Sequence, residues 1–275
     1  MAEDSGDGTV VSRVGVFAEM FREQIEFREL LAAIVRRDLA LRYRNAFLGF
    51  GWAVCMPVLH MLIFTVIFTR VAPLDTGVPY PIYAYAGLVP WNLFASAQRF
   101  GALSLTANPH LVTKVYFPRE VLPFSAVIVA LIDFLVASTV LAGLMAYYGI
   151  APAWSVLFLP VVLVVQLAFT AGVALLVSMA NLFYADVKYV LELALIVWMF
   201  STSVVYPVDR VGGAAGELLA LNPMTPIIEA YRSILIRGEL PAALPFMAVT
   251  LVSFATLAVG WLIFHRAEFR FAEEL

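Results

Sequence analysis

The chain has 275 residues, of which 63% are hydrophobic and 13% are charged, with a formal net charge of −3 at pH 7. The apolar residues form long runs without charges, which excludes an ordinary soluble domain and indicates a protein with lipid as its solvent. The weakly acidic balance gives no sign of nucleic-acid binding. The single cysteine, Cys55, excludes an internal disulfide and is predicted to be a small packing residue.

The chain begins with a polar, acidic segment that lacks the basic region and apolar core of a signal peptide. We predict that residues 1–16 are disordered. In residues 17–47, apolar positions alternate with Arg and Glu at helical spacing, which predicts an amphipathic helix on the cytoplasmic membrane surface. The pattern leaves open whether this helix is only a lipid anchor or also docks a cytoplasmic partner.

From residue 48 to residue 275 the pattern predicts a transmembrane domain with six spanning helices. About 20 apolar residues at 1.5 Å each cross a hydrocarbon core of roughly 30 Å. The predicted spans cover about residues 49–69, 82–105, 121–148, 155–182, 189–206 and 244–264. Pro57 is expected to kink the first span or to be compensated by neighbouring helices. Arginines gather before the first span, and both termini are therefore predicted to be cytoplasmic.

A short cytoplasmic helix is predicted between the second and third spans. Asn108 followed by Pro109 is typical of a helix start, with Asn as the cap and Pro at the first helical position. The helix is expected over residues 110–116, with Lys114 adding positive charge on the cytoplasmic side.

The segment from 206 to 241 is too long for a turn and too apolar for a solvated loop. Proline starts and the glycine stop at Gly238 favour two short helices, at about 211–221 and 226–236. Neither is long enough to span, so re-entry into the outer leaflet requires that they be buried in protein or line a wet cavity. The alternative is a pair of helices lying on the outer surface. The predicted class is an all-α integral membrane protein with an interface helix, six spans and two short re-entrant helices.

Sites for chemistry are sparse in the sequence. The only lysines, Lys114 and Lys188, do not follow a glycine, so no P-loop is present. His60, His110 and His265 are scattered along the chain, and no metal, cofactor or catalytic residue is predicted.

Three ionisable residues fall within predicted spans and are functional candidates for that reason. Arg99 and Glu192 lie near the inner ends, where a structural role is favoured because the charge can reach the interface. Asp133 lies deeper, in the run LIDFLV. Either Arg99 or a polar group on another helix would account for it.

Aromatic residues are abundant, and they fit either interfacial belts and core packing or the lining of a channel. For a channel, flat ring faces suit the apolar faces of sugar rings. The candidate channel residues are Trp52, Phe64, Phe68, Trp198 and Tyr206.

Four stretches resemble the permease subunits of ABC exporters that move lipid-linked polysaccharides such as O-antigen, capsule or teichoic acid. They are RRDLALRYRNAFLGFGWAVCMPVL at 36–59, GLVPWNLF at 87–94, NPHLVTKVYFPREVLP at 108–123 and LNPMTPIIEAYRSIL at 221–235. With the order of the six predicted spans, the resemblance covers nearly the whole chain beyond residue 27.

The resemblance implies that a separate ATPase subunit binds ATP and Mg, and that two permease copies pair with two ATPase subunits in the bacterial inner membrane. The implied substrate is a polyprenyl-linked polysaccharide. The implied ATPase contacts are Arg36, Arg37, Asn108, His110, Lys114 and Tyr116, and the implied outer gate contains Asn222, Pro223 and Pro226. The first and fifth spans would flank the channel.

Two other functions stay open: an ABC permease for a small hydrophobic drug or lipid, and a membrane enzyme acting on polyprenyl phosphates. An enzyme of that kind is expected to gather carboxylates or histidines at one interface. The sequence shows no such cluster.

Overall fold

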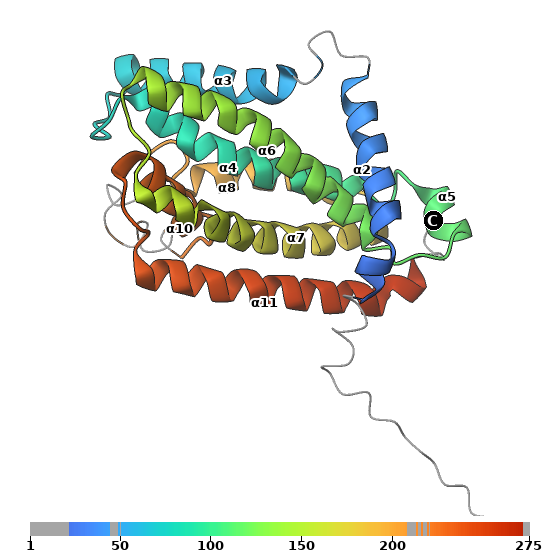
Figure 1. Cartoon of the computed structure of the whole chain (residues 1–275). Helices are drawn as coiled ribbons and strands as arrows, with labels where there is room; N and C mark the ends of the chain where they lie inside the picture. Colours follow the sequence, from blue (N-terminus) through green and yellow to red (C-terminus); the bar gives the residue numbers. More distant parts are fainter. Residues whose placement is uncertain are drawn as a thin grey trace, which may run out of the picture.

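Long helices that run side by side make up the structure, a computed structural model that describes residues 22–44, 49, 51–207, 213, 216, 219 and 221–271 (Figure 1). All regular elements in these residues are helical, which confirms the all-α class. The predicted disordered residues 1–16 and most of the first predicted re-entrant helix, 211–221, lie outside the described part. The long helices are α3 (Gly51–Val66, continued by the π-helix η1, Ile67–Val71), α4 (Tyr80–Leu103), α6 (Val121–Tyr147), α7 (Leu159–Phe183, after the 3-10 turn η2, Trp154–Phe158), α8 (Val187–Phe200) and α11 (Ala243–Ala267, followed by η5, Glu268–Arg270).

Four of these segments are long and apolar enough to cross a membrane by length and composition: Gly51–Val71, Val121–Tyr147, Trp154–Phe183 and Ala243–Arg270. They correspond to the first, third, fourth and sixth predicted spans. The helix α4 has 24 residues but is less apolar, since it carries Asn92, Gln98 and Arg99. The helix α8 has 14 residues, or about 21 Å, which is less than the hydrocarbon core. The six-span topology therefore stays a prediction.

The fifth predicted span, 189–206, forms a shorter helix than expected. The helix α8 ends at Phe200, and residues 201–206 form turns. The carbonyl oxygens of Ser203 and Val204 leave the helical pattern and accept hydrogen bonds from Arg232. Apolar composition alone did not reveal this break.

One end of the bundle carries the elements predicted to face the cytoplasm. The helix α2, Arg28–Tyr43, lies across the ends of the long helices, and α5, Pro109–Lys114, lies at the same end together with the end of α11 (Figure 1). The turn between η1 and α4 and the short helix α10, Met224–Arg232, lie at the opposite end. We call these the α2 end and the α10 end.

The helix α5 begins at Pro109 with Asn108 as its N-cap residue, as predicted, although the Asn108 side chain does not contribute to the cap. The Asn108 side chain makes no capping hydrogen bond, because its Nδ2 donates to the backbone oxygen of Ser104 in the preceding turn at 2.8 Å. The backbone oxygen of Asn108 accepts the first-turn bonds, from the amides of Leu111 and Val112, both at 3.1 Å.

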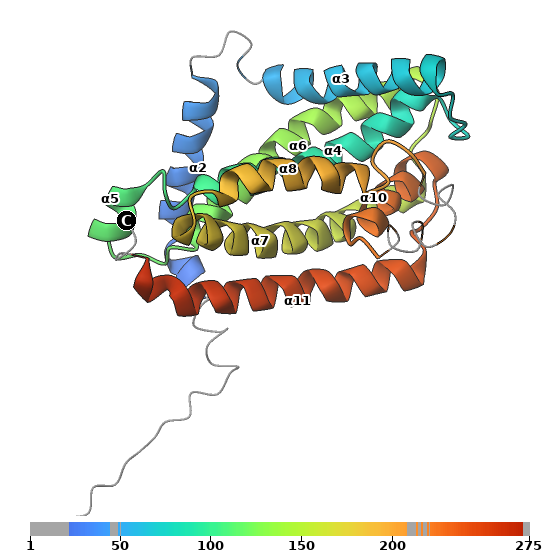
Figure 2. The same cartoon turned by 180° about the vertical axis from the view of Figure 1, so that it is seen from behind.

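The helix α4 forms the centre of the bundle, between α6 on one face and α7 and α8 on the other (Figure 2). Its seam with α7 is polar: Gln98 donates to the Thr170 oxygen at 3.1 Å, and Asn181 donates to the Ala102 oxygen at 2.8 Å. The helices α7 and α11 pack closely at a glycine of α7. A Cβ on Gly172 would lie only 2.6 Å from the backbone of Leu257 in α11. Small residues and interhelical hydrogen bonds are what helices use to associate in lipid.

The second predicted short helix, 226–236, begins slightly earlier than expected. The helix α10 starts at Met224 and continues as the π-helix η4, Ser233–Arg237, which ends at Gly238 in the left-handed conformation (φ 72°). Ile227, Ile228 and Ile234 are fully buried. These isoleucines pack α10 against the bundle, and both its re-entry into the outer leaflet and the surface-lying alternative stay predictions.

Candidate functional site

The three candidate channel aromatics on α3 separate into two groups. Trp52 lies near the α2 end, where it lines a cavity of about 410 Å³. Phe64 and Phe68 lie further along the helix and stack with ring centroids 6.4 Å apart. Phe64 also meets Phe200 of α8 edge to face at 6.4 Å. Phe64 is therefore the candidate on α3 whose ring contacts α8, as a path between the first and fifth spans requires, whereas the Phe68 ring also packs on Tyr80 of α4 at 5.4 Å.

Trp198 combines a packing position with a polar contact. Its ring packs edge to face against Phe94 at 4.9 Å and Phe169 at 6.2 Å. Its Nε1 donates to Oδ1 of Asn222 at 2.9 Å. A candidate channel residue and a candidate gate residue are thus in direct contact. Tyr206 is also held locally, because its hydroxyl donates to the Phe200 oxygen.

Asn222 joins the end of α8 to the start of α10. Its Oδ1 also accepts from the Met224 amide at 3.0 Å, and its Nδ2 donates to the Ser201 oxygen and the Thr202 hydroxyl, both at 2.7 Å. The two candidate gate prolines lie at the helix start, Pro223 before α10 and Pro226 in its first turn. The N–H groups at the start of a helix have no partner within the helix. Proline, which lacks the N–H, therefore costs no intrahelical hydrogen bond at these positions.

Arg232 is a buried cation that the sequence pattern did not single out. It is 1% exposed, and its guanidinium lies 3.7 Å from the centroid of the Tyr83 ring. It donates to the backbone oxygens of Val204 at 2.6 Å, Tyr83 at 3.3 Å and Ser203, and it pairs with Glu229 at 2.8 Å. The available signal was a pair of opposite charges, Glu229 and Arg232, three positions apart in the otherwise uncharged run 227–236.

The α2 end holds the partly buried carboxylate of Asp133. Arg42 and Tyr43, both at the end of α2, donate to its two oxygens, and the Arg42 guanidinium lies 3.7 Å from the Phe100 ring centroid. Arg99 instead pairs with Glu192 of α8 at 3.0 Å. Of the two expected kinds of partner for Asp133, the polar groups on another helix are the ones observed.

Tyr43 stays a neutral donor in this contact. Burial, together with the neighbouring Asp133 carboxylate, raises the pKa of Tyr43 to about 12. The hydroxyl is therefore protonated throughout the physiological range.

The candidate ATPase contacts lie at the α2 end, and most of them are accessible. Arg36 is exposed on α2, and His110, Lys114 and Tyr116 are exposed on or just after α5, with Tyr116 at 91%. Val112 is fully buried and fixes α5 to the bundle. Arg37 pairs with Asp38 at 2.8 Å, and Asn108 points back toward Ser104.

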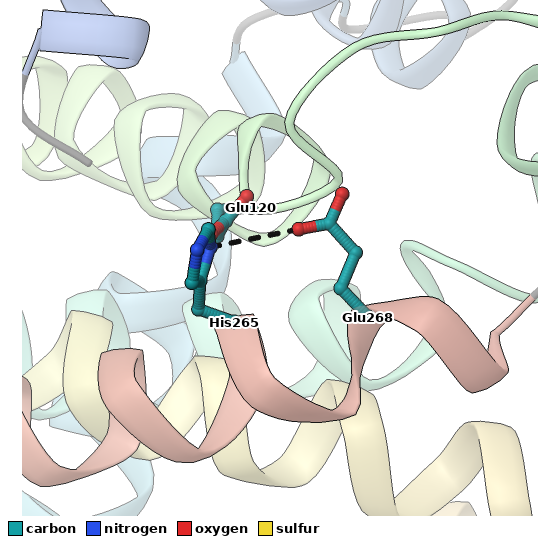
Figure 3. A group of neighbouring side chains, drawn as sticks. All are labelled: Glu120, His265 and Glu268. Carbon is teal, nitrogen blue, oxygen red and sulfur yellow. Dashed lines mark hydrogen bonds and ion pairs between the residues drawn. The ribbon is translucent and has the colours of Figure 1, made fainter. Parts of the chain in front are cut away.

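A cluster of ionisable side chains from the start of α6 and the end of α11 lies next to α5 (Figure 3). His265 Nδ1 lies 3.0 Å from Glu120 and 3.7 Å from Glu268. Arg119 pairs with Glu268 at 2.8 Å and donates to the Val112 oxygen of α5 at 3.4 Å.

One histidine and two carboxylates, with ligand atoms within 4.8 Å of one another, are a set that a metal such as zinc accepts. Arg119 already supplies the positive charge at Glu268, however, so we interpret the group as an ion-pair network. In the sequence, His265 stands 145 positions from Glu120, and nothing local connects them.

Long apolar helices crossed at one end by a basic helix define a multi-pass membrane protein. A family model described as "ABC-2 type transporter" matches residues 29–236. The chain therefore belongs to the ABC-2 type transporter membrane family.

Relatives cover nearly the whole chain. It is 35% identical over 259 residues to an O-antigen export system permease protein, RfbA, of Myxococcus xanthus, covering 93% of this chain and 99% of the relative. An RfbA permease of Klebsiella pneumoniae is 29% identical over 250 residues, covering 90% and 95%. The polysialic acid transport protein KpsM of Escherichia coli is 23% identical over 259 residues, covering 90% and 98%.

Proposed function

We propose that this chain is the permease subunit of an ATP-driven exporter that moves a polyprenyl-linked polysaccharide across the bacterial inner membrane. The observation that carries the proposal is the similarity to an O-antigen export permease over 93% of this chain and 99% of that relative. In this proposal, separate ATPase subunits bind ATP and Mg, and both termini of the permease are cytoplasmic. The arginine-rich α2 supports the orientation through the positive-inside rule.

The α2 end is the surface proposed to dock the ATPase. Exposed Arg36, His110, Lys114 and Tyr116 supply charged and aromatic contacts there. The helix α5 is joined to the bundle through Val112 and through Arg119, which pairs with Glu268 after α11. A displacement of α5 would therefore be transmitted to α6 and α11.

A second copy of the chain is the proposed partner for the face formed by α3 and α8. Both helices expose large apolar side chains: Leu59, Leu62, Ile63, Val66, Val190, Leu193, Ile196, Val197 and Phe200. Two such faces would enclose a channel, with Phe64 and Phe68 near its wall and α10 at its outer end. Lipid covers the remaining apolar surface in this proposal, and no nucleic acid takes part.

Replacement of residues 110–116 by a Gly/Ser linker tests the docking surface. ATP hydrolysis stimulated by the permease, or assembly with the ATPase, is expected to be lost while membrane insertion is kept. The matched control places the same linker in the turn at 73–78, at the α10 end. Full coupled export in the 110–116 variant would contradict the docking proposal.

Reconstitution with the ATPase tests the substrate. Transport of a lipid-linked glycan into proteoliposomes is the expected result. Transport of a fluorescent phospholipid or drug without any glycan would favour the small-molecule permease. Transferase activity of the purified chain alone would favour the membrane enzyme.

A further inference from the structure

A cavity of about 410 Å³ lies between α2, α3, α4 and α6, near the α2 end. Its size falls within the range of roughly 300–1,000 Å³ that is usual for sites of small ligands. Trp52 and Phe100 provide aromatic surface in its wall. Trp52 is 40% exposed, so the α3 wall can be reached from outside the protein.

Polar groups from α3 and α4 line the same cavity. Asn92 and Ser96 lie one turn apart on α4 and therefore on one face, and His60 contributes from α3. The buried Nδ2 of Asn92 has no hydrogen-bond partner among the described residues. A buried amide without a partner costs free energy, which a bound hydroxyl or carbonyl group would recover.

Charged groups close the cavity at the side of α2. Arg42 binds Asp133 through Nη1, and an arginine side chain has five N–H donors in all. Donors that can meet a phosphate oxygen therefore lie in the same cavity as neutral groups that can meet sugar hydroxyls. This combination suits a glycosyl phosphate better than a simple hydrocarbon.

A second cavity, of about 370 Å³, lies between α4, α6, α7 and α10, nearer the α10 end. Val89 and Phe134 line both cavities. The walls of the second are almost entirely apolar and include Leu141, Met145 and Leu163. A polar cavity followed by an apolar one matches an amphiphile whose head group lies nearer the α2 end.

We propose that the two cavities form a binding site for a lipid-linked sugar. The polar cavity holds the glycosyl phosphate head group, with the sugar ring against Trp52 and its hydroxyls at Asn92 and Ser96. The apolar cavity holds the start of the lipid chain. This inference rests on the proposed function and assigns the site of its substrate, within one copy of the chain, before the polymer enters the channel between two copies.

Binding to the complete permease–ATPase complex in lipid nanodiscs, without nucleotide, tests the inference. The three probes are a polyprenyl-pyrophosphate oligosaccharide, polyprenyl pyrophosphate without sugar, and phosphatidylglycerol, each measured by native mass spectrometry. The sugar-bearing lipid is expected to bind the wild-type complex most tightly. Equal binding of the sugar-free lipid or of phosphatidylglycerol would overturn the assignment.

Two variants remove the proposed sugar contacts. Asn92→Leu and Trp52→Ala are each expected to weaken binding of the sugar-bearing lipid at least about fivefold, roughly the loss of one hydrogen bond or stacking contact. The sugar-free lipid is expected to bind these variants as it binds the wild type. Since Trp52 is half-exposed, its variant keeps the test valid if Asn92→Leu fails to fold.

The matched controls are Trp154→Ala and Thr139→Ala. Trp154 is 69% exposed, Thr139 is exposed with its hydroxyl bonded to the Val136 oxygen at 2.7 Å, and neither residue lines either cavity. Both are expected to change binding less than about twofold. If wild type exports glycan while Asn92→Leu and Trp52→Ala bind normally, the site is refuted and the proposed function stands. If wild type exports no glycan at all, the proposed function fails.

Discussion

At the α2 end, separate elements are joined by ion pairs between side chains, whereas at the α10 end they are joined by side chains that bind the backbone. Arg42 with Asp133 and Arg119 with Glu268 are the main pairs at the first end. Arg232 and Asn222 hold the turns that follow α8 at the second. Partly accessible ion pairs can exchange partners with water, but a buried cation on carbonyl oxygens has no such substitute. The comparison indicates an α2 end that can shift and an α10 end that is fixed.

The difference agrees with the proposed direction of coupling. In that proposal the ATPase acts at the α2 end, where α2 and α5 are held by contacts that can re-form after a displacement. At the other end Arg232 is 1% exposed, and a Cβ on Gly87 would lie 2.5 Å from its Nη2, so there is little space for rearrangement. Motion of α10 is therefore expected to carry α4 and the end of α8 with it.

Arg232→Met is expected to cause the largest loss. The change leaves the oxygens of Tyr83, Ser203 and Val204 without their donor, and breaking a buried charged contact typically costs about 3–5 kcal/mol. Thermal stability of the purified protein measures the effect. The control, Arg237→Met, removes a cation whose side chain is 49% exposed on the same segment and should have little effect. Equal stability of the two variants would show that buried Arg232 does not fix the α10 end, and the contrast with the α2 end would fail.

Arg119→Met and Glu268→Gln are expected to cost less, about 1–3 kcal/mol each, because the pair is partly accessible, with side chains 18% and 12% exposed. The double variant Arg119→Glu with Glu268→Arg is expected to recover part of the stability. If the single variants keep stimulated ATP hydrolysis but export less, the result would show that α5 can move without moving α11. A double-mutant cycle with no interaction energy would instead show that the pair does not join these elements.

Trp198→Phe is expected to cost about 0.5–1.5 kcal/mol, since it removes one hydrogen bond to Asn222 and keeps most of the ring packing. Trp198→Leu loses the packing as well and should be clearly worse. The rate of export per folded molecule distinguishes a packing role of Trp198 from a role in the channel. A packing role lowers stability without changing that ratio, whereas a channel role lowers the ratio itself.

Local features of the bundle could be predicted from the sequence. Apolar runs located the long helices, and Pro109 marked the start of α5, because these features depend on neighbouring residues. The break after Phe200 was missed, since it depends on Arg232 about 30 positions further along the chain. Asn108 had a competing partner in Ser104, one turn back, which a capping pattern does not reveal.

The contacts of the candidate site were harder to predict because they join distant elements. The partner of Asp133 lies 91 positions away on α2, and that of His265 lies 145 positions away at the start of α6. A hydropathy pattern orders the helices along the chain but does not say which faces meet. The candidate aromatics show the same limit, as ring type alone does not separate Trp52 beside a cavity from Trp198 in the core.

Tyr43→Phe is expected to have the smallest effect, about 0.5–1 kcal/mol, since it removes one neutral donor from Asp133 while Arg42 remains. Its pH dependence is distinctive. The pKa of Tyr43 is raised to about 12 in the folded protein, so its contribution is fully present below its unfolded pKa of about 10. The contribution is lost as pH rises through the folded value. Wild type should therefore exceed Tyr43→Phe in stability by a constant amount from pH 6 to 9, and the gap should close between about pH 10 and 12. A gap that instead closed near pH 7 would mean that a different group controls the contact between α2 and α6.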